Sequence, residues 1–76
     1  MRKIDAISIA RKAAGSLCHN VESSYDEGAG RGMVRLYFSP SVPASLIPRA
    51  VDAAQKALDA AATSGAAWTV KWTTLL

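Results

Sequence analysis

The sequence predicts a small α+β domain with the element order α-β-β-α-β, in which two helices pack on one face of a three-stranded, mainly antiparallel sheet. Three observations support this class. Two alanine-rich segments carry apolar residues at helical spacing, and three other segments alternate apolar and polar residues as strands do. Glycine or proline separates most of these segments. The chain has 76 residues, and we expect a single domain over residues 1–76.

The first helix is predicted over residues 3–14. Ile4, Ile7, Ala10 and Ala14 lie near one face of such a helix, so we expect them to face the core. Gly15 follows directly, at the position where glycine commonly ends a helix.

A hairpin is predicted next, with strands over residues 17–25 and 33–38. In the first strand the residues of one parity are Leu17, His19, Val21 and Tyr25. In the second strand Val34, Leu36 and Phe38 share one side, and Arg35 and Tyr37 share the other. The loop over residues 26–32 is rich in glycine and connects the strands, and Pro40 and Pro43 end the second one.

The second helix is predicted to begin after Ser45, whose hydroxyl suits an N-cap, and to end at Ser64 and Gly65. Pro48 falls in the first turn, where its missing N–H costs nothing. The apolar stripe comprises Ile47, Val51, Ala54, Leu58 and Ala61. The opposite side carries charges of alternating sign, namely Arg49, Asp52, Lys56 and Asp59.

The last strand contains both tryptophans of the chain. Trp68, Val70 and Trp72 lie on one face of it, and we expect the two tryptophans to fill a core that is otherwise short of bulky side chains. This strand either lies beside the first strand, or runs parallel to the second through a crossover around the long helix. Both arrangements leave an open sheet edge, where a partner or a second subunit can add a strand.

Composition limits the protein further. Half of the residues are apolar, but many are alanine, and a chain of this length buries only about 60% of its surface on folding. We therefore expect a homodimer or a partner that completes the core. The single Cys18 excludes an internal disulfide and indicates a reducing compartment. No membrane-spanning run and no signal-peptide pattern is present, so we expect a soluble, cytoplasmic protein.

The candidate chemical motifs lack the geometry that catalysis or metal binding needs. Cys18 and His19 are adjacent, so in a strand they point to opposite faces, and zinc needs about four such ligands. The segment 28–32 lacks the Lys-Ser/Thr of a phosphate-binding loop and leads into a strand. We expect no cofactor, no metal site and no enzymatic activity.

Two functional hypotheses follow. The first is a small non-enzymatic protein-binding domain that acts by stoichiometric binding to a larger host complex, as inhibitors encoded by phages and other mobile elements do. Its expected partner-binding residues are Glu22, Asp26, Glu27, Arg31, Arg35, Tyr37 and Lys71. The alternative is a nucleic-acid-binding module, in keeping with a net charge of +3, that uses Arg2, Lys3, Arg11, Lys12 and Arg35. This alternative gains support if Tyr37, Trp68 and Trp72 share a face with Arg35.

Overall fold

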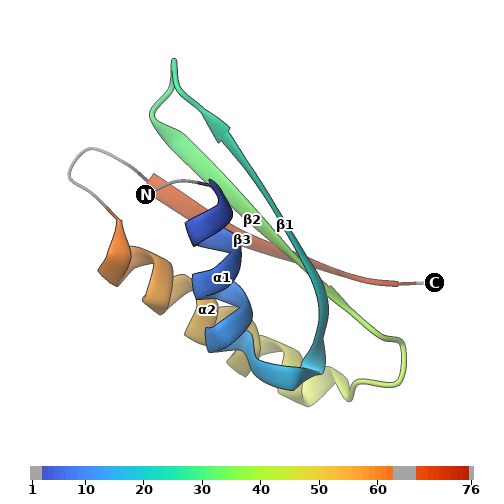
Figure 1. Ribbon diagram of the computed structural model, residues 1–76. Coiled ribbons are helices and arrows are strands. Elements are labelled where there is room, and N and C mark those ends of the chain that lie inside the picture. Colours follow the sequence, from blue (N-terminus) through green and yellow to red (C-terminus); the bar gives the residue numbers. More distant parts are fainter. Residues whose placement is uncertain (1–2, 63–66, 76) are drawn as a thin grey trace.

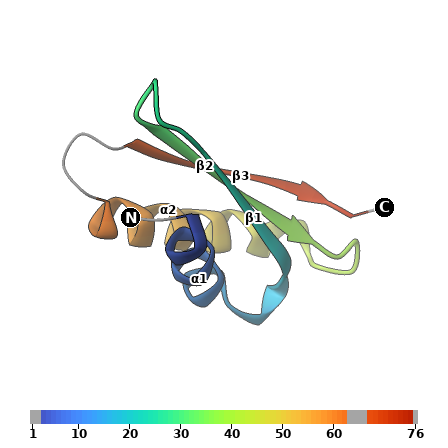
Figure 2. The ribbon, with the colours of Figure 1, turned by 45° about the horizontal axis from the view of Figure 1, so that its top comes forward.

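The computed structural model describes residues 3–62 and 67–75. Its helices and strands are α1 (Lys3–Ala14), β1 (Cys18–Asp26), β2 (Arg31–Phe38), α2 (Ile47–Ala61) and β3 (Ala67–Thr74). The strands form one sheet in the order β1-β2-β3, and both helices pack on the same face of it (Figures 1 and 2). The fold class expected from the sequence is therefore confirmed.

The third strand takes the second of the two positions left open by the sequence. β2 pairs with β1 in antiparallel orientation and with β3 in parallel orientation, so the sheet is mixed. α2 provides the crossover between β2 and β3 (Figure 1). This topology places β2 in the middle and leaves β1 and β3 as edge strands.

The helix α1 has the bounds that the sequence predicts, and Gly15 follows it with a φ of +79°. The buried face, however, is a row of alanines at a spacing of four, with Ala6 and Ala10 fully buried. Ile4 is 65% exposed, so the expectation that it faces the core is wrong. Small side chains let α1 approach α2 closely, and α2 meets it with buried alanines of its own, so the contact line lies on the alanine row instead of on Ile4.

The strand β1 begins with an irregularity that changes its alternation. Cys18 pairs with Phe38 and Asn20 pairs with Tyr37, so His19 is an extra residue, as in a β-bulge. His19 is consequently exposed while Val21 is buried, although the sequence placed both on one face. Leu17 precedes the strand, in a short 3₁₀ turn.

The hairpin turn is shorter than the loop predicted over 26–32, because β2 already begins at Arg31. The side chain of Asp26 accepts a hydrogen bond from the backbone N–H of Ala29 at 3.2 Å. Gly30 closes the turn with a φ of +66°, a conformation that favours glycine.

The helix α2 follows a 3₁₀ turn over Ala44–Leu46 and has Pro48 in its first turn, as predicted. Ser45 lies inside that 3₁₀ turn and α2 has no side-chain cap, so the predicted N-cap is wrong. The buried residues of α2 are Ile47, Ala50, Ala54 and Leu58. Ala61, the last residue of the helix, is exposed and does not belong to the buried stripe. The predicted end at residues 64–65 lies outside the described residues.

The core lies between the helices and β2, where Val34, Leu36 and Phe38 are fully buried. Trp68 is only 4% exposed and fills the core as expected. Trp72 is 49% exposed, so the same expectation does not hold for it, although its ring meets Phe38 edge-on at 6.2 Å between centroids. In the described part of the chain, neither helix is long and apolar enough to cross a membrane.

Candidate binding surface

The face of the sheet turned away from the helices carries no covering element in the described structure (Figure 2). We call it the open face. Strand alternation places on it the side chains that lie opposite the core positions. These are Glu22, Ser24 and Asp26 from β1, Arg31, Met33, Arg35 and Tyr37 from β2, and Thr69, Lys71 and Thr73 from β3.

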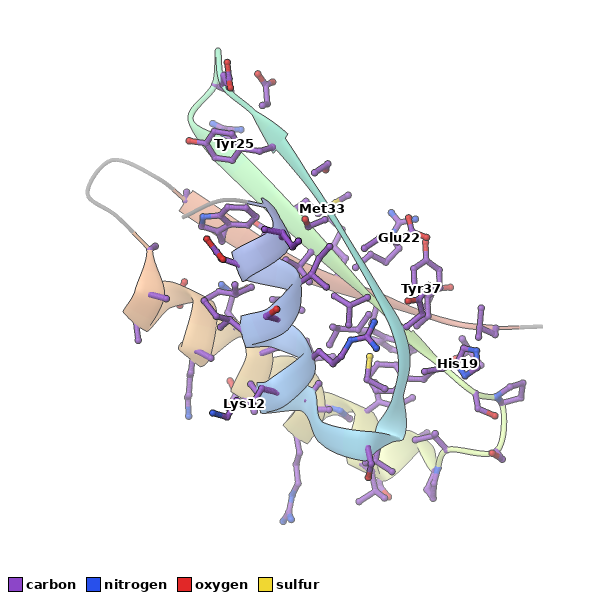
Figure 3. All side chains as sticks on the ribbon, in the orientation of Figure 1. Lys12, His19, Glu22, Tyr25, Met33 and Tyr37 are labelled. Atoms are coloured by element: carbon purple, nitrogen blue, oxygen red, sulfur yellow. The ribbon has the colours of Figure 1, made fainter. Side chains whose placement is uncertain are left out.

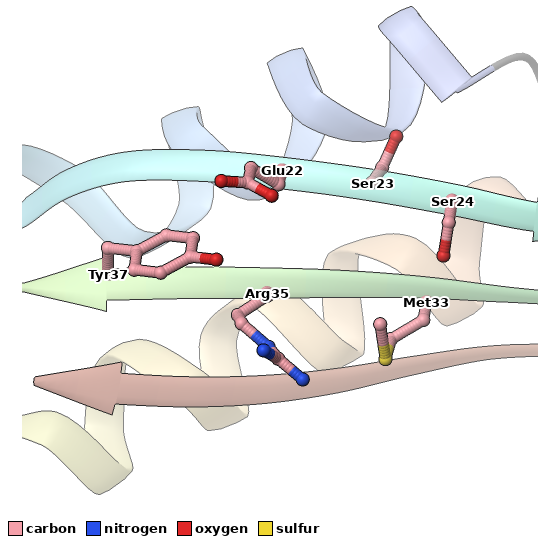
Figure 4. Close-up of a pocket in the computed structure, with 6 residues that line it drawn as sticks. All are labelled: Glu22, Ser23, Ser24, Met33, Arg35 and Tyr37. Carbon is pink, nitrogen blue, oxygen red and sulfur yellow. The ribbon is translucent and has the colours of Figure 1, made fainter.

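A row of charged side chains crosses the middle of the open face. Glu22, Arg35 and Lys71 are direct register partners on the three strands. The guanidinium of Arg35 extends towards β3 and away from Glu22, whose carboxylate lies over β1 (Figure 4). The guanidinium of Arg35 is thus directed towards the strand that carries Lys71, its cationic register partner. Two like charges opposite each other destabilise a sheet when nothing neutralises them. Among the described residues, no ion pair involves any member of this row.

Two shallow hollows adjoin one another on the open face. The first, of about 200 Å³, is lined by Glu22, Ser23, Ser24, Met33, Arg35 and Tyr37 (Figure 4). The second, of about 420 Å³, is lined by Ser24, Asp26, Arg31, Gly32, Met33, Thr69 and Lys71. Both are open depressions in a sheet surface. Such a surface suits a macromolecular partner better than an enclosed small molecule.

The structure gathers most of the expected partner-binding residues on this face. Those on it are Glu22, Asp26, Arg31, Arg35, Tyr37 and Lys71, and each lines one of the hollows. Glu27 is exposed in the hairpin turn and lines neither. The sequence interpretation missed Met33, which lines both hollows; its parity with Arg35 and Tyr37 was the available signal.

A second residue that sequence reasoning missed is Gln55 on α2. Its Nε2 donates to the carbonyl oxygen of Trp68 at 2.7 Å, and its Oε1 accepts from the backbone N–H of Val70 at 2.9 Å. The same Nε2 donates to Asp59 at 2.9 Å. Gln55 therefore occupies part of the outer edge of β3, as a neighbouring strand would. Helical periodicity carries no signal for this role.

The aromatic residues do not assemble as the nucleic-acid hypothesis requires. Trp68 and Trp72 lie on the helix-covered side of the sheet, where Trp68 stacks on Tyr25 with 5.5 Å between ring centroids. Tyr37 lies on the open face, far along the sheet from Tyr25 (Figure 3). Arg11 lies on α1, across the sheet from Arg35, and hydrogen-bonds to Asn20 at 3.4 Å. Arg2 and the side chain of Lys3 lie outside the described structure.

The Cys18–His19 pair forms no metal centre in residues 3–62 and 67–75, where no group of three His, Cys, Asp or Glu side chains is placed to hold an ion. The thiol of Cys18 contacts the carbonyl oxygen of Asn20 at 3.1 Å, whereas His19 is exposed at the bulge. The two side chains therefore lie in different environments.

No protein-family model matches this chain, and no curated protein or solved structure shows significant similarity to it. The function of the open face must therefore be inferred from its own residues.

Proposed function

We propose that this chain is a non-enzymatic protein-binding domain whose open face docks on an acidic surface of a larger protein. The observation that carries the proposal is the pair Arg35 and Lys71, which stand opposite each other on β2 and β3. Cross-strand pairs of like charge destabilise a sheet. Carboxylates of a partner would neutralise both cations and relieve their repulsion. The resulting charge-assisted hydrogen bonds would favour binding and fix the orientation of the partner.

The rest of the open face supports a protein partner. Acidic side chains stand on β1 (Glu22 and Asp26), and the cations stand on β2 and β3, so the face has two sides of opposite sign. Met33 lies on β2 between Arg31 and Arg35, lines both hollows and supplies a flexible apolar contact. A partner with an acidic patch beside a basic one is thus held in one orientation.

Binding of this kind acts by occupying a surface, and it needs no catalytic group. The proposal extends to stoichiometric inhibition of a host complex, the mode of action of many small proteins from phages and mobile elements. Its support is a binding face that spans the width of the sheet.

Nucleic-acid binding is the second candidate, and the open-face cations together with Tyr37 favour it. The placement of both tryptophans on the other side of the sheet weighs against it, since single strands bind by stacking on exposed aromatic rings. Binding of random single-stranded DNA or RNA that falls steeply between low and moderate salt would favour this candidate over the first.

The test is charge reversal on the open face. The tagged chain is used to capture proteins from a lysate of the organism that encodes it, and captured proteins are identified by mass spectrometry. The double variant Arg35→Glu, Lys71→Glu should lose the partner. The control, Lys12→Glu with Arg49→Glu, makes the same change of net charge at exposed helix positions and should retain it.

The interaction is then repeated with the purified partner, by titration calorimetry. Equal affinity of the two double variants would reject docking through the open face. A partner surface without acidic residues would reject the charge complementarity on which the proposal depends.

A further inference from the structure

The long side chains of the open face form a row along β2. Arg31, Met33 and Arg35 occupy alternate positions of this strand, so the Cα atoms of the two arginines are about 13 Å apart with Met33 midway. Met33 lines both hollows, whereas Arg35 lines the smaller one and Arg31 the larger one. The row therefore presents a cation, an apolar side chain and a second cation at regular intervals.

The strand β3 extends this row sideways. Arg35 and Met33 both reach from β2 towards β3 (Figure 4). There the larger hollow is lined by the short side chain of Thr69 and by Lys71, the register partner of Arg35. Within residues 3–62 and 67–75, none of the three cations forms an ion pair. Both ends of the row are thus available to anionic groups of a partner.

The backbone of the sheet offers this partner no hydrogen bonds. N–H and C=O groups of a strand point along the sheet towards the neighbouring strands, so an extended segment gains main-chain bonds at an edge and not on a face. A helix satisfies its own backbone groups and binds through its side chains. Helices already cover the opposite face of this sheet (Figure 2). The open face therefore favours a helical occupant.

We propose, on the basis of the protein-binding function above, that the partner contacts this face with an acidic α-helix that carries two carboxylates on either side of one apolar side chain. Residues i, i+4 and i+8 lie along one side of a helix, and the outer two are about 12 Å apart. This distance is close to the separation of the two arginines. One carboxylate then lies between Arg35 and Lys71. The apolar residue packs on Met33, and the other carboxylate binds Arg31.

The acidic side chains of β1 determine which side of the helix carries the carboxylates. Glu22 and Asp26 are the β1 register partners of Arg35 and Arg31, so they lie on the side of the row away from β3. Carboxylates of the partner would be repelled there, whereas basic side chains would be attracted. The two carboxylates of the helix therefore face β3.

A synthetic peptide tests the spacing. The probe is an alanine-based helix of about 20 residues, long enough to be helical in water, with Glu at i and i+8 and Leu at i+4. The control peptide has the same composition, with the second Glu at i+6 on the far side of the helix. Amide NMR of the labelled chain at millimolar peptide should show the probe on β2 and β3 and the control bound about tenfold more weakly, because one charge-assisted hydrogen bond is lost. Equal binding of both peptides, or no response to the probe, would overturn the proposal.

Variants of the chain test the individual contacts. Arg31→Gln should weaken binding of the probe about tenfold, whereas Lys12→Gln, at an exposed position of α1, should leave it unchanged. Met33→Ser should weaken it several-fold through loss of the apolar contact. Circular dichroism establishes that the variants are folded. Unchanged affinity of Arg31→Gln would overturn the arrangement with two carboxylates.

An extended peptide distinguishes a helical partner from protein binding in general. The sequence Glu-Pro-Leu-Pro-Glu cannot form a helix, and it holds its outer residues about 12 Å apart. Tighter binding of this peptide than of the helical probe would overturn the helical occupant, and the protein-binding function would stand if Arg35→Glu, Lys71→Glu still loses the native partner. Equal capture of the native partner by that variant and by its control would instead reject the proposed function.

Discussion

Gly32 is the position at which a single methyl group should damage this fold most specifically. It is the register partner of both Tyr25 and Trp68, and the indole of Trp68 lies over it. A Cβ built at Gly32 would stand 2.4–2.5 Å from three ring carbons of Trp68. The six-membered part of the indole would therefore have to move, and its stack on Tyr25 would move with it.

The cost of Gly32→Ala follows from three contributions. Overpacking of a buried site costs about 1–3 kcal/mol. Loss of an aromatic pair adds about 0.5–1.5 kcal/mol if the ring is displaced from Tyr25. The reduced entropy of the unfolded chain offsets about 0.4–1 kcal/mol. The net loss of unfolding free energy is therefore about 0.5–4 kcal/mol. Each kcal/mol lowers Tm by about 4–8 °C in a domain of this size.

Thermal and urea unfolding of the purified variant measure this loss, with Gly28→Ala as the matched control. Gly28 lies in the exposed turn with a negative φ, and a Cβ there meets only Asp26 at 3.4 Å, so its Tm should stay close to that of the wild type. Trp68→Val removes the obstructing ring, and Gly32→Ala should cost much less in that background. A Tm of Gly32→Ala at or above the wild-type value would refute the packing argument.

Two further substitutions test other contacts. Gln55→Ala should lower the unfolding free energy by about 1–2 kcal/mol, because two backbone groups of β3 lose their partner at a half-buried edge. Urea unfolding measures this loss, with the exposed Arg49→Ala as the control. A loss no larger than that of Arg49→Ala would contradict the prediction. Leu58→Ala empties a fully buried position and should cost about 2–5 kcal/mol, whereas Lys56→Ala breaks only the exposed pair with Asp52 and should cost about 0.3–0.5 kcal/mol. Equal losses in the second comparison would show that α2 is not packed as described.

Most of the fold could be predicted from the sequence because each element carries its own local pattern. The helix α1 was predicted with its observed bounds, since Gly15 provides a clear end. The errors lie where side chains respond to neighbours distant in sequence. Ile4 has the right spacing for a core residue, yet the alanine row of α1 decides where the two helices touch. The bulge at His19 is a property of pairing with β2, and nothing in the local alternation indicates it.

The candidate site could be predicted where the alternation of side chains along one strand decides which residues share a face. Arg35 and Tyr37 were assigned to the side of β2 opposite the core, and they lie there. That Lys71 stands beside Arg35 depends on the parallel placement of β3, which the sequence left open. The hydrogen bonds of Gln55 to β3 depend on how α2 lies across the sheet, so they too were beyond prediction.

The sequence by itself determined the order of the elements and the side of β2 that faces the core, because these follow from local periodicity and from the residues that end helices and strands. Tertiary structure decided how β3 pairs and how the two tryptophans, identical in parity, differ in burial. The ring of Trp68 lies over a glycine that makes room for it and stacks on Tyr25, whereas Trp72 lies near the C-terminal end of β3, where α2 has diverged from the strand. Burial depends on the crossing of whole elements, and no local pattern encodes that crossing.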